Sequence, residues 1–204
     1  RAVAGQGEGN RLARERDRYE LLLEINHTLV SNLNLRELIS AVSGCLRRVL
    51  PHDVAGLALY DPTINKLRAT AMDFPDHEDV FIEDDIIELE GTLSGRAFTT
   101  RLPVMIGSSD LSTDRFAMRT GLKTGCKIPL ISHDRVLGVL GLGRLSEDAF
   151  TDEDCELLTA VGEQVAVAVE NALAYRKIDE LKNKLQEETL YLQEELRSEY
   201  NFEE

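Results

Sequence analysis

The most constraining feature is the stretch GCKIPLISHDRVLGVLGLGRL at residues 125–145. Two apolar runs rich in Ile, Val and Leu flank the polar turn SHDR, and the second run contains three glycines. Apolar runs of strand length joined by a short polar turn predict a β-hairpin, and glycine within a strand marks close backbone approach. The chain must therefore build a sheet around this hairpin.

Four more strands are expected outside that hairpin. VAGLALYD at 54–61 and LRATAMD at 67–73 are joined by DPTINK, whose Pro, Asn and Asp are typical turn residues. DIIELEG at 85–91 and PVMI at 103–106 complete a set of six. Because the connections are mostly short and hairpin-like, we expect an antiparallel sheet.

Helices are predicted at both ends of this set. Apolar residues spaced by three and four indicate a helix up to residue 33, and Asn34 with Glu37 resembles a capping box for a second helix from Leu35 to about Leu50, where Pro51 stops it. A third helix begins after Thr151 and continues almost to the end. The order predicts an α+β fold: a six-stranded antiparallel sheet, terminal helices on one face, and a loop-covered pocket on the other.

The spacing of apolar residues changes in the last 29 residues of the chain. Ile178, Leu185 and Leu192 are seven apart, with Leu181 at a complementary position and Glu, Lys and Gln elsewhere. This spacing predicts a short coiled coil, although Glu188 occupies an expected apolar position. The apolar stripe of the predicted N-terminal helix would pack together with this coiled coil in a dimer. The predicted dimer residues are Tyr19, Leu22, Asn26, Leu29, Ile178, Leu181, Leu185 and Leu192.

Charge and composition exclude several classes of protein. The net charge is −14, with 23 Lys and Arg against 37 Asp and Glu, which disfavours a nucleic-acid surface. We expect a cytoplasmic segment without membrane contact, because no apolar run reaches spanning length and the N-terminus lacks a signal-peptide core. The three cysteines are far apart in sequence and are expected to be buried singly.

Three motifs in order resemble the GAF family over residues 35–175: GTLSGRAFTTRLPVMI, KIPLISHDRVLGVLGLG and FTDEDCELLTAVGEQVAVAVENALAY. The resemblance implies a sensory module that holds a small molecule between sheet and loops and dimerises through flanking helices. EELRSEYNFEE resembles the linker before the AAA+ ATPase in sigma-54-dependent activators of the formate-hydrogenlyase-activator type. It implies three parts: a dimerisation and signalling helix with its flexible start (1–33), a sensor domain (34–175), and a linker (176–204) toward an AAA+ domain whose P-loop this chain lacks.

Candidate ligand-binding residues lie on the expected pocket side. Arg96, near a helix N-terminus, suits a formate-like carboxylate, although it would equally face water or pair with a carboxylate. Residues around 115–119 would close over a ligand or simply anchor a loop, and alternation puts residues 126 and 127 on opposite faces. The candidates are Tyr60, Arg96, Arg115, Phe116, Met118, Arg119, Cys126 and Lys127.

No catalytic, metal or cofactor site is predicted. His77 lies among acidic residues, but without a recognised ligand spacing, and a solvated acidic loop is the simpler interpretation. The leading hypothesis is a non-catalytic sensing and dimerisation module of a transcriptional activator, responding to a small anion such as formate. The alternatives are a cysteine-dependent free methionine sulfoxide reductase using Cys126, and a structural dimerisation spacer without a ligand.

Overall fold

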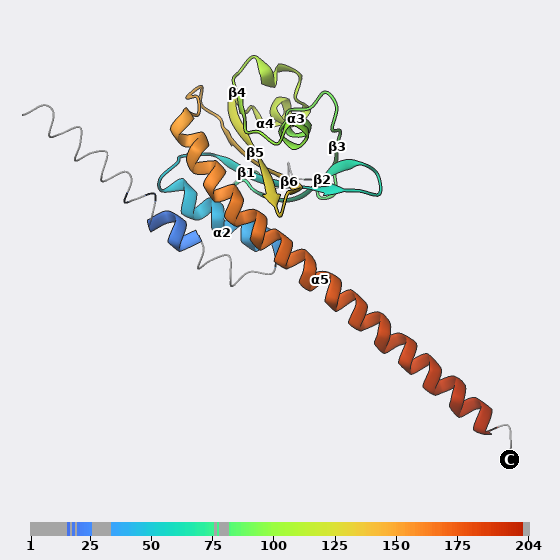
Figure 1. Cartoon of the computed structure of the whole chain (residues 1–204). Coiled ribbons are helices and arrows are strands. Elements are labelled where there is room, and N and C mark those ends of the chain that lie inside the picture. The colour runs from blue at the N-terminus through green and yellow to red at the C-terminus, as the bar shows by residue number, and fades with distance from the viewer. Residues whose placement is uncertain are drawn as a thin grey trace, which may run out of the picture.

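The computed structural model describes residues 16, 18, 20–25, 34–75, 77 and 82–201, with side chains left out at 112, 113, 115 and 195–201. Six strands form one antiparallel sheet in the order β3-β2-β1-β6-β5-β4 (Figure 1). The strands are β1 Val54–Asp61, β2 Lys66–Asp73, β3 Ile86–Ile87, β4 Val104–Ile106, β5 Thr124–Ser132 and β6 Arg135–Arg144. The helices are α2 Leu35–Arg47, α3 Leu93–Thr100, η2 Asp110–Thr113, α4 Arg115–Thr120 and α5 Asp152–Asn201.

The predicted α+β architecture is confirmed. Helices α2 and α5 lie side by side on one face of the sheet, and α3 and α4 lie on the other (Figure 1). The third strand is shorter than expected: only Ile86 and Ile87 form a ladder with β2, and the chain bends at residues 89–92 before α3 begins. Helix α2 likewise ends at Arg47, three residues before the predicted end.

The central hairpin forms around His133 and Asp134. Their φ angles are 45° and 63°, so both turn residues are left-handed, as a two-residue turn between twisted strands requires. A register shift between Leu130 and Ile131 then changes the pairing of β5 with β6. Every pair of residues farther from the turn is offset by one residue.

The larger core lies between the sheet and the terminal helices. Leu158, Val161 and Val165 of α5 are fully buried against it, and α2 contributes Leu38 and Ile39. Residues 20–25 are helical, and Leu21 and Ile25 are buried in the same core.

Side-chain caps fix where α2 and α5 begin. Asn34 accepts a hydrogen bond from the Arg36 N–H at 2.9 Å. Before α5, the Asp154 N–H donates to Thr151 Oγ1 and the Thr151 N–H donates to Asp154 Oδ2, which is a reciprocal capping box. Both starts were predicted from these polar residues.

Helix α5 runs for 50 residues and leaves the domain as a single rod (Figure 1). It is also long and apolar enough, by length and composition alone, to cross a membrane, which corrects the expectation that no such stretch exists. Half of the apolar window is buried inside the domain, and a core helix passes the same test. Its Ala and Val side chains pack on the sheet, and their small size lets the helix approach it closely.

Candidate functional site

The face away from α2 and α5 carries a second, smaller core. Helices α3 and α4 cover the sheet there, with η2 beside them, and bury mostly small apolar side chains. The buried members are Ala58, Leu67, Ala97, Val104, Ile106, Leu111, Ala117 and Val139. This is the face on which the sequence predicts a pocket.

Lys127 introduces a cation into that face. It lies on β5 directly opposite Gly141 of β6, and its side chain extends over that glycine. A Cβ built at Gly141 would lie 2.7 Å from Lys127 Nζ, so the absence of a side chain there makes room for the lysine. Burial lowers the pKa of Lys127, because the charged ammonium is disfavoured away from water.

Asp114 supplies the opposing charge. It is the N-cap of α4, where its Oδ1 accepts a hydrogen bond from the Ala117 N–H at 2.9 Å. Its attraction partly offsets burial and raises the pKa of Lys127. Sequence reasoning missed Asp114, although an Asp immediately before a short helix is a recognised N-cap signal.

Tyr60 lies beneath α3 on the same side. Its ring stacks on Phe98, with ring centroids 4.7 Å apart and the planes tilted by 30°. Its hydroxyl donates to Asn65 Oδ1 at 2.9 Å, within the β1–β2 turn. Tyr60 therefore contributes an aromatic wall, while its hydroxyl serves the turn.

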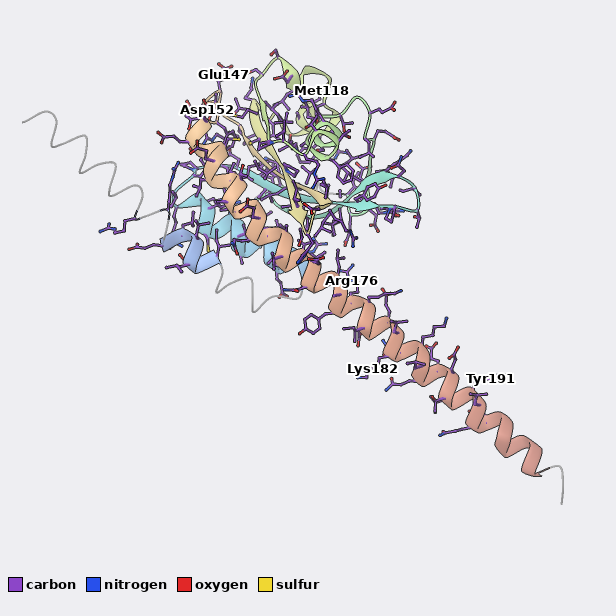
Figure 2. All side chains as sticks on the ribbon, viewed as in Figure 1. Met118, Glu147, Asp152, Arg176, Lys182 and Tyr191 are labelled. Atoms are coloured by element: carbon purple, nitrogen blue, oxygen red, sulfur yellow. The ribbon has the colours of Figure 1, made fainter. Side chains whose placement is uncertain are left out.

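The other predicted ligand residues are scattered. Phe116 is half-buried in α4, whereas Arg96 and Arg119 are exposed. Met118 is 62% exposed and lies at the outer side of the domain (Figure 2). The side chain of Arg115 lies outside the described residues.

Cys126 lies on the opposite face from its neighbour Lys127. It is fully buried in the core beneath the terminal helices, and burial raises the pKa of its thiol to about 12. Because the thiolate is the reactive form, this environment suppresses nucleophilic attack at neutral pH. Cys126 and Lys127 therefore do not belong to one site.

A separate open groove of about 790 Å³ lies at the base of the rod, lined by the start of α2, the β1–β2 turn and Arg176. Four of its charged residues form ion pairs: Arg36 contacts Glu83 at 2.9 Å and Arg68 contacts Asp61 at 2.7 Å. Hydrogen bonds from Thr63 and Arg68 lower the pKa of Asp61 to about 2. The groove is therefore a solvated, charge-compensated surface.

The predicted dimer residues fall into two groups. On α5, Ile178, Leu181, Leu185 and Leu192 are all about half exposed or more, beyond the region where the helix contacts the sheet. Leu22 instead packs partly buried against the domain's own core. Tyr19, Asn26 and Leu29 lie outside the described residues.

A family model described as GAF domain matches residues 32–170, which is more than half of the chain. The chain belongs to the GAF family. The matched range contains the whole sheet, helices α2, α3 and α4, and the first part of α5. Within the described residues, no three His, Cys, Asp or Glu side chains are grouped to hold a metal ion in this GAF domain.

Relatives and solved structures agree with this assignment. The formate hydrogenlyase transcriptional activator FhlA of Escherichia coli is 34% identical over 92% of the chain, which spans only 28% of that relative's length. A GAF domain from a phosphoenolpyruvate-protein phosphotransferase of Coxiella burnetii superposes with a TM-score of 0.68 at 17% identity, covering 79% of this chain and 98% of that one.

A free methionine-R-sulfoxide reductase from Neisseria meningitidis, determined with its substrate, superposes with a TM-score of 0.64 at 18% identity. The superposition covers 78% of this chain and 91% of the reductase chain. At such identities the two structures establish the shared GAF fold alone.

Proposed function

We propose that this GAF domain is a non-catalytic sensing and dimerisation module that regulates a bacterial sigma-54-dependent transcriptional activator in the cytoplasm. The observation that carries the proposal is the combination of a GAF body, similar to part of FhlA, with an α5 rod that exposes a heptad stripe. An exposed apolar stripe of this spacing is stabilised by a second helix. The rod would connect the body to an AAA+ domain in the longer protein.

A second copy of the chain is the partner that the stripe suits. Ile178, Leu185 and Leu192 share one heptad position, and Leu181 lies at the adjoining one, so two parallel rods would bury them together. Leu190 is equally exposed, at 61% against 62% for Leu185, but projects from another side of the helix. It therefore provides a matched control.

Sedimentation equilibrium tests the dimer. The chain should be a dimer at tens of micromolar, and Leu185→Asp should weaken association by about tenfold or more, because it places like charges in the seam. Leu190→Asp should leave association unchanged. A monomer before mutation, or equal loss in both variants, would contradict the proposed seam.

The effector would be a small anion, of which formate is the leading candidate. Lys127 is a cation on the face of the sheet that α3 and α4 cover (the lid face), with Gly141 leaving room for it and Asp114 nearby as an internal countercharge. A carboxylate entering beneath α4 would gain a charge-assisted hydrogen bond from the ammonium. The half-buried Phe116 and the exposed Arg119, both on α4, would then lie at the edge of the site.

The position of Lys127 in β5 also suggests how ligand binding would affect helix α5. The residues before and after it in β5 point to the opposite face, where Ile128 and Cys126 pack in the core beneath α5. A ligand that favours one packing of the sheet would thereby favour one position of the helix.

Thermal unfolding with added formate tests the ligand. The unfolding temperature should rise with concentration, since a ligand that binds only the native state stabilises it by RT ln(1 + [L]/Kd). Lys127→Met, similar in length but uncharged, should abolish the rise, and acetate gives a specificity control. No formate-dependent shift would favour the spacer alternative.

The reductase alternative depends on Cys126. The sheet separates this thiol from the lid face, and its raised pKa disfavours the thiolate, which supports the non-catalytic role. An assay for turnover of free methionine sulfoxide, compared with Cys126→Ser, distinguishes the two: sulfoxide reduction lost on that substitution would establish the enzymatic function.

A further inference from the structure

The β5–β6 turn (residues 132–135) contains two adjacent residues in the left-handed conformation, and neither is glycine. His133 and Asp134 have φ angles of 45° and 63°. Two-residue turns of this kind favour Asn-Gly, because glycine adopts positive φ without steric cost. Disfavoured backbone conformations persist where contacts from the surrounding structure hold them. Two helices hold this turn, and they lie on opposite faces of the sheet.

One contact comes from α3, on the lid face. Arg101 is the C-cap of α3, and its Nη2 donates a hydrogen bond to the Asp134 carbonyl oxygen at 2.8 Å. Helix α3 also packs on both β5 and β6. A shift of the C-terminal end of α3 would therefore act directly on the backbone of the turn.

The other contact comes from α5. Ser132 is only 5% exposed, and its hydroxyl donates to Glu170 Oε2 at 2.6 Å. His133 Nδ1 lies 3.2 Å from the same carboxylate oxygen. The hydrogen bond from Ser132 is the main cause of a lowered pKa at Glu170, so the turn binds the ionised carboxylate. Strand β5 thus ends beside α5 and is hydrogen-bonded to it (Figure 1).

Glu170 lies where α5 leaves the domain. Among the described side chains of α5, Ala172 is the last that is buried, and all those from residue 174 onward are exposed. The β5–β6 turn therefore contacts α5 at the end of its packed part. A change in this contact alters how the helix lies at its exit, because no described side chain beyond it is buried against the domain.

The Ser132 hydroxyl has two acceptors within reach. Besides Glu170 Oε2, His133 Nδ1 lies 3.1 Å from Ser132 Oγ, and an imidazole that carries its proton on Nε2 accepts a hydrogen bond there. The Glu170 side chain is 34% exposed, so water can solvate its carboxylate when the hydroxyl turns away. The buried hydroxyl is satisfied in both arrangements. The turn therefore has two hydrogen-bonded states, and in only one of them does Ser132 hold α5.

We propose that the β5–β6 turn is a conformational relay that couples the C-terminal end of α3 to α5, with Ser132 as the group that engages or releases Glu170. In the engaged state, Arg101 holds Asp134 while the Ser132 hydroxyl binds the carboxylate. In the released state the hydroxyl donates to His133, and α5 is free to tilt on the sheet. The coupling acts within one domain and requires neither formate nor a second copy of the chain.

Hydrogen exchange of the full chain, followed by mass spectrometry of its peptides, tests the coupling. Arg101→Ala removes the donor to Asp134 and should raise local opening of α5 at residues 166–174 by about threefold, because the engaged state becomes less favoured. Arg96→Ala is the matched control: it removes the same charge from another exposed position on α3 and should leave these amides unchanged. Ser132→Ala should in turn raise exchange in the last turn of α3, since coupling is reciprocal.

A double variant distinguishes a relay from two separate contacts. When Ser132→Ala is present, Arg101→Ala should have no further effect on residues 166–174, because the connection to Glu170 is already lost. Glu170→Ala breaks the same connection from the helix side and should give the same result. An equal effect of Arg101→Ala with and without Ser132 would overturn the proposal, and so would α5 exchange that Arg101→Ala leaves unchanged in the otherwise unaltered chain.

Discussion

The two halves of helix α5 carry similar apolar stripes and bury them differently. In the first half, Leu158 and Val165 are fully buried against the sheet, whereas in the second half Ile178 and Leu185 are each 62% exposed. One uninterrupted helix therefore stabilises the domain at one end and offers an unpaired surface at the other. Apolar spacing alone does not distinguish these roles; only the presence of a sheet beneath the first half does.

The largest expected effect comes from the buried half. Leu158→Ala should lower the free energy of unfolding by about 3 kcal/mol, because it removes apolar contacts and leaves a cavity in a fully packed site. Urea unfolding followed by circular dichroism measures this loss. A loss no larger than that of an exposed leucine would mean that the first half of α5 does not hold the domain together.

Acid should weaken the body of the domain through His52, which lies at the end of the α2 layer. Burial lowers its pKa, and the neutral ring hydrogen-bonds Leu50 O through Nδ1 at 2.8 Å and Ser43 Oγ through Nε2 at 2.9 Å. Arg47 disfavours the protonated ring, while Asp53 and Asp73 weakly favour it.

The sign of the pH effect follows from this lowered pKa. The unfolded chain binds the proton more tightly, so the contribution of His52 is fully present above pH 6.5 and is lost as pH falls from that value through the lower pKa of the folded state. At pH 5.5 the loss is at most about 1.4 kcal/mol, a ceiling set by an ordinary histidine pKa near 6.5. His52→Asn should flatten this part of the stability curve in urea unfolding at each pH; an unchanged slope would exclude His52 as its source.

The smallest effect is expected in the exposed half. Leu185→Ala should change the unfolding free energy of the body by less than about 0.5 kcal/mol at concentrations where the chain is monomeric. Leu190→Ala is the control of equal exposure. If Leu185→Ala proved as costly as Leu158→Ala in the monomer, the contrast between the two halves would be lost.

Local patterns predicted most of the fold because they reflect local causes. The hairpin at 125–145 and the capped starts of α2 and α5 depend on residues close in sequence, and all three are confirmed. The β3 strand was overestimated, because an apolar run cannot reveal how much of it an edge of the sheet will pair.

The candidate site was less predictable. A two-residue turn with Ser132 opposite Arg135 would place Lys127 opposite Leu140, but the shift at Leu130/Ile131 places it opposite Gly141. The space for the Lys127 side chain thus depends on this register shift, which the residue types in the hairpin do not predict.

The unbroken course of α5 has a mechanical consequence. From residue 176 to its last turn, the helix extends about 40 Å beyond the domain at a rise of about 1.5 Å per residue. It contains neither proline nor glycine there to act as a joint. A tilt of about 5° where α5 rests on the sheet would displace its far end by about 3 Å, so the helix is a lever arm whose length multiplies a small repacking at its fulcrum.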